Sequence, residues 1–358
     1  AFFILIWGFS LSGNCIKSQY IIYSPKSTID YLHQNHYFSV EKKLLMKKVL
    51  FALVVTLFVS MSVFSQKNDA EFKVIGYYVP RIEPETVPFD ILTHVNYSFA
   101  IPAKTGDTLI PLKDDSKLIR LVELAHQKDR KVFISIGGWG IGDGGGDDTR
   151  FHKMSETEAG RQRFIKSTMS LVDKYNLDGV DLDWEYPDEK SQSADDYVEL
   201  VKALAEKLHA QDKELTAAVI SYGEKGYGIK AEVFEYMDWV NPMAYDNDYG
   251  PDYIKAHSPY SLAIKSLDYW IKERGLPAEK CVLGLPFYAK RGMGKYGPSY
   301  KGLLEDGASP YDDYHKGSFY NGMLTIEAKT KLAMERGCAG VMVWEISHDT
   351  NDETSLFR

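Results

Sequence analysis

The 358-residue chain is poor in three features, each of which would define a class of protein. It has three cysteines, too few for a scaffold built from disulfides. Its 42 basic residues are outnumbered by 50 acidic ones, so it lacks the positive field that binds nucleic-acid phosphates. Its most apolar stretch covers 49–64, about 16 residues against the roughly 20 of a membrane-spanning helix. These three classes are therefore disfavoured.

The composition of the chain is typical of a globular protein, with a high share of aromatic residues. Hydrophobic residues make up 44% of it and charged residues 26%, which excludes a globally disordered chain. Aromatic residues reach 13%, with 24 tyrosines. This share fits a large core and equally a surface that stacks against sugar rings, so composition leaves both possibilities open.

The N-terminal segment differs from the rest of the chain. Residues 1–45 show no sustained hydrophobic period. Met46 is followed by two lysines, Lys47 and Lys48, and then by the apolar run 49–64. Small residues stand three and one positions before Gln66, which predicts a signal peptide over 46–65 with cleavage near Ser65. A membrane anchor is the alternative, disfavoured by the shortness of the run. We expect 1–45 to be an upstream extension and 66–358 to be a secreted mature chain, extracellular or periplasmic.

From residue 73 onward, short β-branched runs alternate with stretches of helical period. Eight runs are predicted as strands: Lys73–Val79, Thr93–Phe99, Val132–Ile136, Gly179–Glu185, Leu215–Ile220, Trp239–Ala244, Val282–Phe287 and Gly340–Glu345. Eight strand–helix units in about 280 residues predict an α/β fold of one domain, a (β/α)8 TIM barrel. A doubly wound open sheet is the alternative, but no G-x-G-x-x-G follows the first strand.

Three smaller signals also set expectations. Ser155 and Glu158 have the spacing of a capping box, which predicts a helix opened by Ser155. The segment Asp352–Leu356 has the character of the first turn of an eighth barrel helix, so we expect that helix to be truncated. Cys281 and Cys338, the cysteines of the predicted mature chain, could form a disulfide or remain buried thiols.

The predicted fourth strand carries acidic residues in a regular pattern. Residues 178–187 read D-G-V-D-L-D-W-E-Y-P. Because alternate residues of a strand share a face, Asp181, Asp183 and Glu185 point one way and the apolar residues between them point the other. In a barrel the apolar set packs against helices, so the carboxylates face the interior. Burying unpaired charge is costly, so this pattern indicates function rather than stability.

The three carboxylates also suggest acid–base chemistry. Like charges this close cannot all ionise at neutral pH, so at least one pKa must rise. Glu185 stands at the carboxyl end of the strand, where barrel enzymes place catalysis, and is the candidate proton donor. Asp181 and Asp183 lie beneath it and can share a proton. No second carboxylate is placed as a separate nucleophile, which an ordinary glycosidase would need.

The sequence also resembles a known family. The pattern D-x-x-D-x-D-x-E, formed by Asp178, Asp181, Asp183 and Glu185, is similar to the signature of family 18 glycoside hydrolases, the chitinases. Further segments resemble the family in the same order: Ser135-Ile136-Gly137-Gly138-Trp139, Met243-Ala244-Tyr245-Asp246, Gly284–Tyr288 and Gly340–Trp344. The resemblance runs from about Lys73 to Thr354.

This resemblance implies substrate-assisted, retaining hydrolysis of β-1,4 bonds between N-acetylglucosamine units. Glu185 would protonate the glycosidic oxygen while the acetamido carbonyl of the sugar attacks C1. Asp183 would stabilise the resulting oxazolinium ion, Asp181 would hold the counter-charge below it, and Tyr245 would bind the attacking carbonyl. The expected partner is chitin or a chitooligosaccharide. We expect a monomer with no cofactor, metal, nucleic acid or stable membrane anchor.

The resemblance also implies roles for residues around these groups. Asp246, Trp344, Trp139, Met243 and Tyr288 are the candidate sugar contacts, with Trp344 as the floor beneath the N-acetyl group. Asp178, Ser135, Gly137 and Gly138 are expected to be structural, the small residues letting the third strand pass close to the fourth.

Two features depart from the family pattern. Many members carry an α+β module between the seventh and eighth strands, whereas Tyr288 to Gly340 leaves about 50 residues for the whole connection. We therefore expect a compact form without that module and a shallow, open cleft. Where the family often has Gly-Arg, this chain has Ala289-Lys290, so the next residue, Arg291, is the candidate for the sugar contact.

The same motif leaves two other functions open. One is an endo-β-N-acetylglucosaminidase that cuts the chitobiose core of N-glycans, although Trp184 and Trp344 favour chitin-like substrates. The other is a non-catalytic chitin-binding lectin on the same barrel, which the presence of Glu185 argues against.

We predict that the exported protein begins near Gln66, because signal peptidase cuts after small residues that follow an apolar run. N-terminal sequencing of the secreted product is the measurement. A start upstream of Met46, or retention of the protein in the cytoplasm, would contradict the signal-peptide assignment.

Overall fold

A computed structural model of the chain describes residues 71–139, 149–247 and 256–358. The expected extension, the signal peptide and its cleavage site lie outside these residues. Among the helices that the structure describes, none is both long and apolar enough to cross a membrane.

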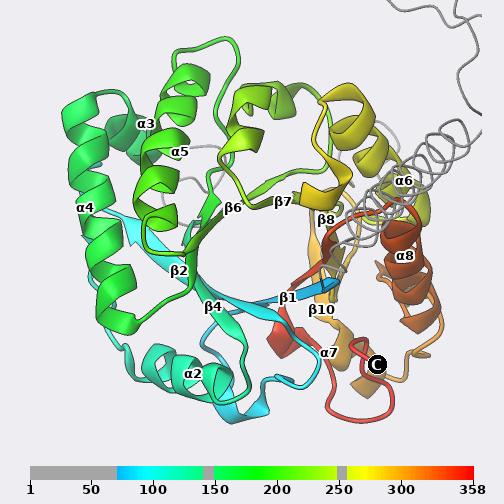
Figure 1. Cartoon of the computed structure of the whole chain (residues 1–358). Coiled ribbons are helices and arrows are strands. Elements are labelled where there is room, and N and C mark those ends of the chain that lie inside the picture. The colour runs from blue at the N-terminus through cyan, green and yellow to red at the C-terminus, as the bar shows by residue number, and fades with distance from the viewer. Residues whose placement is uncertain (1–70, 140–148, 248–255) are drawn as a thin grey trace, which may run out of the picture. The chain divides into compact units, whose positions relative to one another are not determined.

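Eight parallel strands form the inner ring of the fold (Figure 1). They are β1 (Lys73–Tyr78), β2 (His94–Pro102), β4 (Lys131–Gly137), β5 (Gly179–Asp183), β6 (Glu214–Ile220), β7 (Trp239–Met243), β8 (Val282–Pro286) and β13 (Gly340–Trp344). A parallel bridge between Val240 and Cys281 joins β7 to β8, and β13 pairs with both β8 and β1, which closes the ring. The predicted barrel is confirmed, and each predicted strand lies within three residues of an observed one at both ends.

Helices surround the ring on most sides (Figure 1). They are α2 (Ser116–His126), α3 (Thr149–Ser155), α4 (Glu158–Tyr175), α5 (Ser193–His209), α6 (Tyr260–Leu267) with its continuation η4 (Asp268–Glu273), and α8 (Met323–Glu335). Between β1 and β2 the chain forms the 3-10 turn η1 (Pro84–Thr86), and between β6 and β7 it forms η2 (Glu224–Gly228) and η3 (Ala231–Glu235). After β13 comes η6 (Ile346–His348), and residues 351–358 form turns.

Helix α4 begins at a different residue from the one that the sequence predicted. Its N-cap is Thr157, whose Oγ1 accepts a hydrogen bond from the Gly160 amide at 3.1 Å. Ser155 instead ends α3, where its hydroxyl donates to the Phe151 carbonyl at 2.9 Å. The capping-box assignment of Ser155 is therefore wrong, because the chain bends between two helices here and Thr157 caps the second one.

Alternate side chains of the barrel strands point outward and inward, and they form two separate apolar cores. The outward side chains of β5, including Trp184 just after it, pack with the surrounding helices in the larger core. Trp184 stacks on Phe151 of α3, with ring centroids 5.1 Å apart, and meets Tyr197 of α5. Trp184 therefore faces away from the barrel interior and carries no weight in the choice of substrate. The smaller core fills the barrel with Ile75, Tyr77, Phe133, Trp239, Tyr245, Val282, Tyr288 and Met342.

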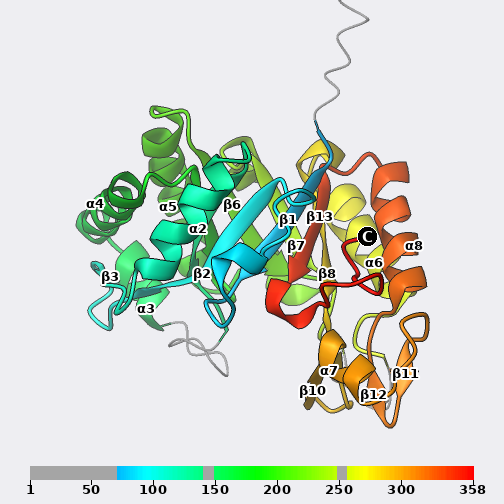
Figure 2. The same ribbon diagram turned by 90° about the horizontal axis from the view of Figure 1, so that it is seen from below.

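The compact connection from β8 to α8 carries a small antiparallel sheet that the sequence did not predict. Its strands are β9 (Tyr288–Lys290), β10 (Tyr296–Ser299), β11 (Tyr314–His315) and β12 (Ser318–Phe319), in the order β10-β9-β12-β11. With α7 (Tyr300–Glu305) this sheet stands beyond the carboxyl ends of the barrel strands, at the bottom of Figure 2. Strands of two to four residues are too short to show the period-2 alternation that identifies a strand.

The two cysteines of the barrel are both buried, free thiols. Cys281 immediately precedes β8 and Cys338 lies two residues before β13. A hydrogen bond between them, together with burial, raises the pKa of Cys281 well above its usual value. The structure therefore favours the second of the two states that the sequence left open.

Candidate active site

The carboxyl ends of the barrel strands open onto a cleft of about 450 Å³. Eight of the predicted catalytic and sugar-contacting residues line it: Trp139, Asp183, Glu185, Met243, Tyr245, Asp246, Tyr288 and Trp344. This is the end of the barrel at which such folds carry their chemistry. Asp181, also predicted as catalytic, is fully buried and does not line the cleft.

The Asp181 carboxylate receives hydrogen bonds on both oxygens. Oδ2 accepts from the Tyr77 hydroxyl at 2.6 Å and from Ser135 Oγ at 2.8 Å. Oδ1 accepts from Thr216 Oγ1 at 2.7 Å and from Asn241 Nδ2 at 3.2 Å. Burial raises the pKa of Asp181, and these four donors oppose the rise because they stabilise the ionised form. The four bonds use the acceptor capacity of the carboxylate, which suits a fixed negative charge.

Glu185 follows β5 and keeps some exposure to the cleft. The Tyr186 hydroxyl donates to its Oε2 at 2.8 Å. Burial raises the pKa of Glu185 to about 7 and the charge of Asp246 adds to the rise, while hydrogen bonds with Tyr186 and Asp183 oppose it. The sequence attributed a raised pKa to neighbouring carboxylates, but burial is the larger cause. A carboxylic acid that titrates near neutrality is suited to general acid catalysis.

Two glycines allow β4 and the residues after it to lie against the end of β5. Gly137 has φ +114°, and a Cβ there would stand 2.3 Å from the Asp183 carbonyl oxygen. Gly138 has φ +88°, and a Cβ there would stand 2.7 Å from the Phe99 ring. The Gly138 amide donates to the Asp183 carbonyl at 2.9 Å. This geometry agrees with the structural role expected for the two glycines, whereas Ser135 also donates to Asp181.

Asp178 lies at the opposite end of the barrel from the cleft, just before β5. Its Oδ2 accepts from the Val132 amide at 2.8 Å and lies 2.8 Å from His126 Nε2. These contacts tie the start of β5 to the start of β4 and the end of α2.

Trp344, at the end of β13, forms an aromatic surface in the cleft. Its ring stacks on Phe99 with centroids 5.7 Å apart, and the Tyr77 ring meets it at 5.6 Å. Tyr245 also lines the cleft, and burial raises the pKa of its hydroxyl well above the usual value. The hydroxyl therefore keeps its proton and can donate a hydrogen bond. Trp139, after β4, lies at the cleft with 42% of its surface exposed, so it is not a buried loop anchor.

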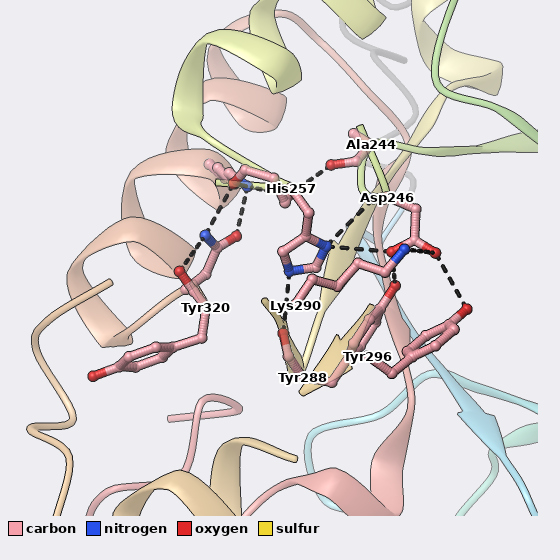
Figure 3. Close-up of polar contacts among 10 residues, drawn as sticks. Ala244, Asp246, His257, Tyr288, Lys290, Tyr296 and Tyr320 are labelled. Atoms are coloured by element: carbon pink, nitrogen blue, oxygen red, sulfur yellow. Dashed lines mark hydrogen bonds and ion pairs between the residues drawn. The ribbon is translucent and has the colours of Figure 1, made fainter. Parts of the chain in front are cut away.

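Asp246 is the centre of a second polar cluster (Figure 3). The Tyr288 hydroxyl donates to Oδ1, and His257 Nδ1 lies 3.3 Å from the same oxygen. Lys290 Nζ lies 3.2 Å from Oδ2, and the Tyr296 hydroxyl reaches that oxygen at 3.4 Å. Burial alone would raise the pKa of Asp246, but His257, Lys290 and Tyr288 together hold it below its usual value.

Lys290, and not Arg291, points toward the cleft. Lys290 is buried against Asp246, whereas Arg291 is exposed and its Nε lies 3.4 Å from Ser318 Oγ. Arg291 follows the end of β9 and is not among the residues that line the cleft. The structure therefore lends no support to the expectation that Arg291 supplies that contact.

A buried lysine supports the segment that carries Tyr245 and Asp246. Lys329 of α8 donates to the Ser258 carbonyl at 2.6 Å, to Ser258 Oγ at 2.7 Å and to Asn321 Oδ1 at 2.6 Å. Ser258 Oγ in turn donates to the Ala244 carbonyl at 2.7 Å. Burial lowers the pKa of Lys329 to about 7. Helix α8 thereby holds the end of β7 from outside the barrel.

Sequence reasoning missed several partners of the predicted residues: Tyr77, Thr216 and Asn241 around Asp181, Tyr186 beside Glu185, and His257 and Lys290 beside Asp246. Strand alternation could have found the first three, because each is a polar-headed side chain at an inward position of a predicted strand. His257 follows no strand and has no local signal. Among the described residues, no group of three or more His, Cys, Asp or Glu side chains could hold a metal ion.

A parallel barrel with a raised-pKa acid at the end of its fourth barrel strand is the architecture of a barrel glycoside hydrolase. The family model described as glycosyl hydrolases family 18 matches residues 73–349, and the chain belongs to this family.

Known proteins similar to this chain bear chitinase names. Probable chitinase 10 of Drosophila melanogaster is 29% identical over 254 residues, 62% of this chain but 11% of that protein, so this chain matches a small part of it. A class V chitinase of Medicago truncatula is 28% identical over 79% of this chain and 80% of its own length. The crystal structure of the family 18 chitinase ChiB of Flavobacterium johnsoniae is 26% identical and has a TM-score of 0.71, covering 81% of this chain and 92% of that one.

We predict that Tyr186→Phe moves the alkaline limb of the kcat/KM profile to higher pH by roughly one unit. The Tyr186 hydroxyl stabilises the Glu185 carboxylate, so its removal raises the pKa of Glu185 above about 7. The acid then stays protonated to higher pH. The measurement is the pH dependence of kcat/KM on a soluble chitooligosaccharide, with the exposed Tyr311→Phe as the matched control. A limb that stays in place, or moves to lower pH, would show that Tyr186 does not tune this acid.

Proposed function

We propose that the protein is a chitinase that hydrolyses β-1,4 bonds between N-acetylglucosamine units in chitin or chitooligosaccharides, with retention at C1. The observation that carries the proposal is Glu185, an acid with a pKa of about 7 at the carboxyl end of β5, open to the cleft. The family and the chitinase names of similar proteins support this substrate class.

The other carboxylates of the cleft support a mechanism without a protein nucleophile. Besides Asp183 and Glu185, the described part of the cleft holds Asp246 and Glu345. Asp246 is held by Lys290 and Tyr288, as described above. Glu345 is buried, and its Oε1 lies 2.8 Å from Arg81 Nη1 and 3.0 Å from His348 Nε2. A carboxylate bound by cations is a poor nucleophile, so the substrate's own acetamido group is the better candidate for that role.

In the first step Glu185 gives its proton to the glycosidic oxygen, and the bond from C1 to that oxygen breaks. The acetamido carbonyl oxygen forms a bond to C1 from the opposite side, which makes a cyclic oxazolinium ion. Asp183, beside Glu185, would stabilise the positive charge through the acetamido N–H. The protonated Tyr245 hydroxyl would orient the carbonyl, and the Trp344 ring would support the N-acetyl group from below.

In the second step water attacks C1 and opens the oxazolinium ring. Glu185, now a carboxylate, accepts a proton from that water and returns to its starting state. Asp181 lies beneath Asp183, and its four hydrogen bonds stabilise the ionised form against the rise in pKa that burial causes. Two inversions at C1 give net retention.

Three further properties belong to this proposal. The protein is exported after cleavage near Ser65, as the N-terminal pattern predicts. It acts as a monomer, and it cuts within chains, in keeping with a connection of about 50 residues between Tyr288 and Gly340.

Glu185→Gln should lower kcat by about 10²–10⁴-fold or more while leaving oligosaccharide binding largely intact, because the amide cannot donate the catalytic proton. Product release from chitotetraose measures the rate, and calorimetric titration measures binding. Glu189→Gln, the same substitution at an exposed position outside the cleft, is the matched control. A Glu185→Gln protein with more than about a tenth of wild-type activity would remove Glu185 from the role of acid.

The first product from chitotetraose should be the β-anomer, and a de-N-acetylated sugar at the cleaved position should resist hydrolysis because it lacks the attacking carbonyl. Anomer-resolved NMR during hydrolysis is the measurement. An initial α-anomer would mean direct attack by water and a second catalytic carboxylate. Faster release of glycans from a high-mannose glycoprotein than cleavage of chitotetraose would instead indicate an endo-β-N-acetylglucosaminidase.

A further inference from the structure

Two exposed aromatic side chains line the cleft, and a third lies in the small sheet beside it. Among the described residues, the exposed aromatic side chains are Trp139, Tyr260, Tyr296, Tyr311 and Tyr314. Trp139 and Tyr296 line the cleft, and Tyr296 and Tyr314 belong to strands β10 and β11 of the small sheet. A single exposed aromatic residue is ordinary, but a group that adjoins a cleft marks an interaction surface.

The register of the small sheet places four side chains in one row. Tyr296 of β10 stands opposite Lys290 of β9, and Lys290 stands opposite Phe319 of β12. Phe319 in turn stands opposite Tyr314 of β11. Residues directly opposite one another in antiparallel strands point to the same face of the sheet. Tyr296, Lys290, Phe319 and Tyr314 therefore share a face.

That face is the one turned toward the cleft. Lys290 lies 3.2 Å from Asp246, and the Tyr296 hydroxyl reaches the same carboxylate, as Figure 3 shows. The opposite face is turned toward α7. His315, the neighbour of Tyr314 along β11, lies 3.0 Å from the Asp306 carboxylate at the end of α7. The row therefore begins at Asp246 and runs outward across the sheet.

The row exposes aromatic rings, and the ammonium group of its lysine is already paired with Asp246. Tyr296 is 60% exposed and Tyr314 is 56% exposed, and the Tyr314 and Phe319 rings lie 5.0 Å apart. The cation of Lys290 is buried and engaged by Asp246. Strands about 4.8 Å apart make a row of four roughly 14 Å long. Rings with a hydroxyl at the edge suit the apolar faces and hydroxyl rims of pyranose sugars.

We propose that Tyr296, Phe319 and Tyr314, here called the aromatic row, bind the part of a β-1,4-linked N-acetylglucosamine chain that leaves the cleft. This inference rests on the proposed function. The occupant is a long, neutral polysaccharide because the row is continuous with the cleft at Tyr296 and because its lysine charge is neutralised by Asp246. A short oligosaccharide held within the cleft would not reach Tyr314, at the far end of the row.

Binding to insoluble chitin and to chitotetraose tests the proposal, in a Glu185→Gln background so that nothing is cleaved. Tyr314→Ala should weaken retention on colloidal chitin by about two- to tenfold and leave the affinity for chitotetraose unchanged. Tyr314→Phe keeps the ring and should retain binding. Tyr311→Ala removes an equally exposed tyrosine outside the row and should change neither. Unchanged chitotetraose binding also shows that each variant is folded.

Several outcomes would overturn the proposal. They are full retention of Tyr314→Ala on chitin, an equal loss on chitotetraose, and an equal effect of Tyr311→Ala. A dimer of the parent protein that Tyr314→Ala converts to a monomer, seen by light scattering, would assign the row to a contact between copies. A protein with intact Glu185 that fails to cleave chitotetraose, but binds chitin in a Tyr314-dependent way, would refute the proposed function and leave the aromatic row standing.

Discussion

The structure depends on one buried carboxylate. The four donors to Asp181 come from four different strands: Tyr77 from β1, Ser135 from β4, Thr216 from β6 and Asn241 from β7. With β5, which carries Asp181 itself, five of the eight barrel strands meet at this group. A buried carboxyl group is tolerated only when its oxygens are hydrogen-bonded, so the five strands must hold their relative register around Asp181. The same bonds place Asp183 and Glu185 above it.

The cleft above Asp181 separates groups that must stay ionised from one that must not. Asp246 is kept ionised by Lys290, Tyr288 and His257, and its charge in turn helps to raise the pKa of Glu185. Burial is the largest cause of the raised pKa of Glu185, so this pKa depends on the residues that cover Glu185 as well as on the charge of Asp246. Asp246 and Glu185 thus line the same cleft with pKa values shifted in opposite directions.

Much of the fold and the centre of the site could be predicted from the sequence, because both rest on local periodicity. The eight strand runs, and the alternation that puts Asp183 and Glu185 on the inward face, need no knowledge of distant contacts. Alternation places Tyr77, Thr216 and Asn241 at inward positions, but it does not assign them to Asp181. Tyr77 and Asn241 lie on strands that are not neighbours of β5, so their hydrogen bonds to Asp181 depend on how the ring closes. The small sheet was missed because its strands are too short to show a period. The place of Lys290 beside Asp246 was missed because the facing of β9 is set by its pairing with β10.

The small sheet has a consequence for how this barrel can change. It is joined to the rest of the molecule through one connection between β8 and α8, and the strands that pair around Asp181 do not include it. Side chains of β11 and β12 could therefore be exchanged without disturbing the hydrogen bonds around Asp181. β9 is the exception, since Tyr288 and Lys290 hold Asp246. If the aromatic row binds the polymer as proposed, the residues that bind the polymer and the residues that cleave it can evolve on separate parts of one chain.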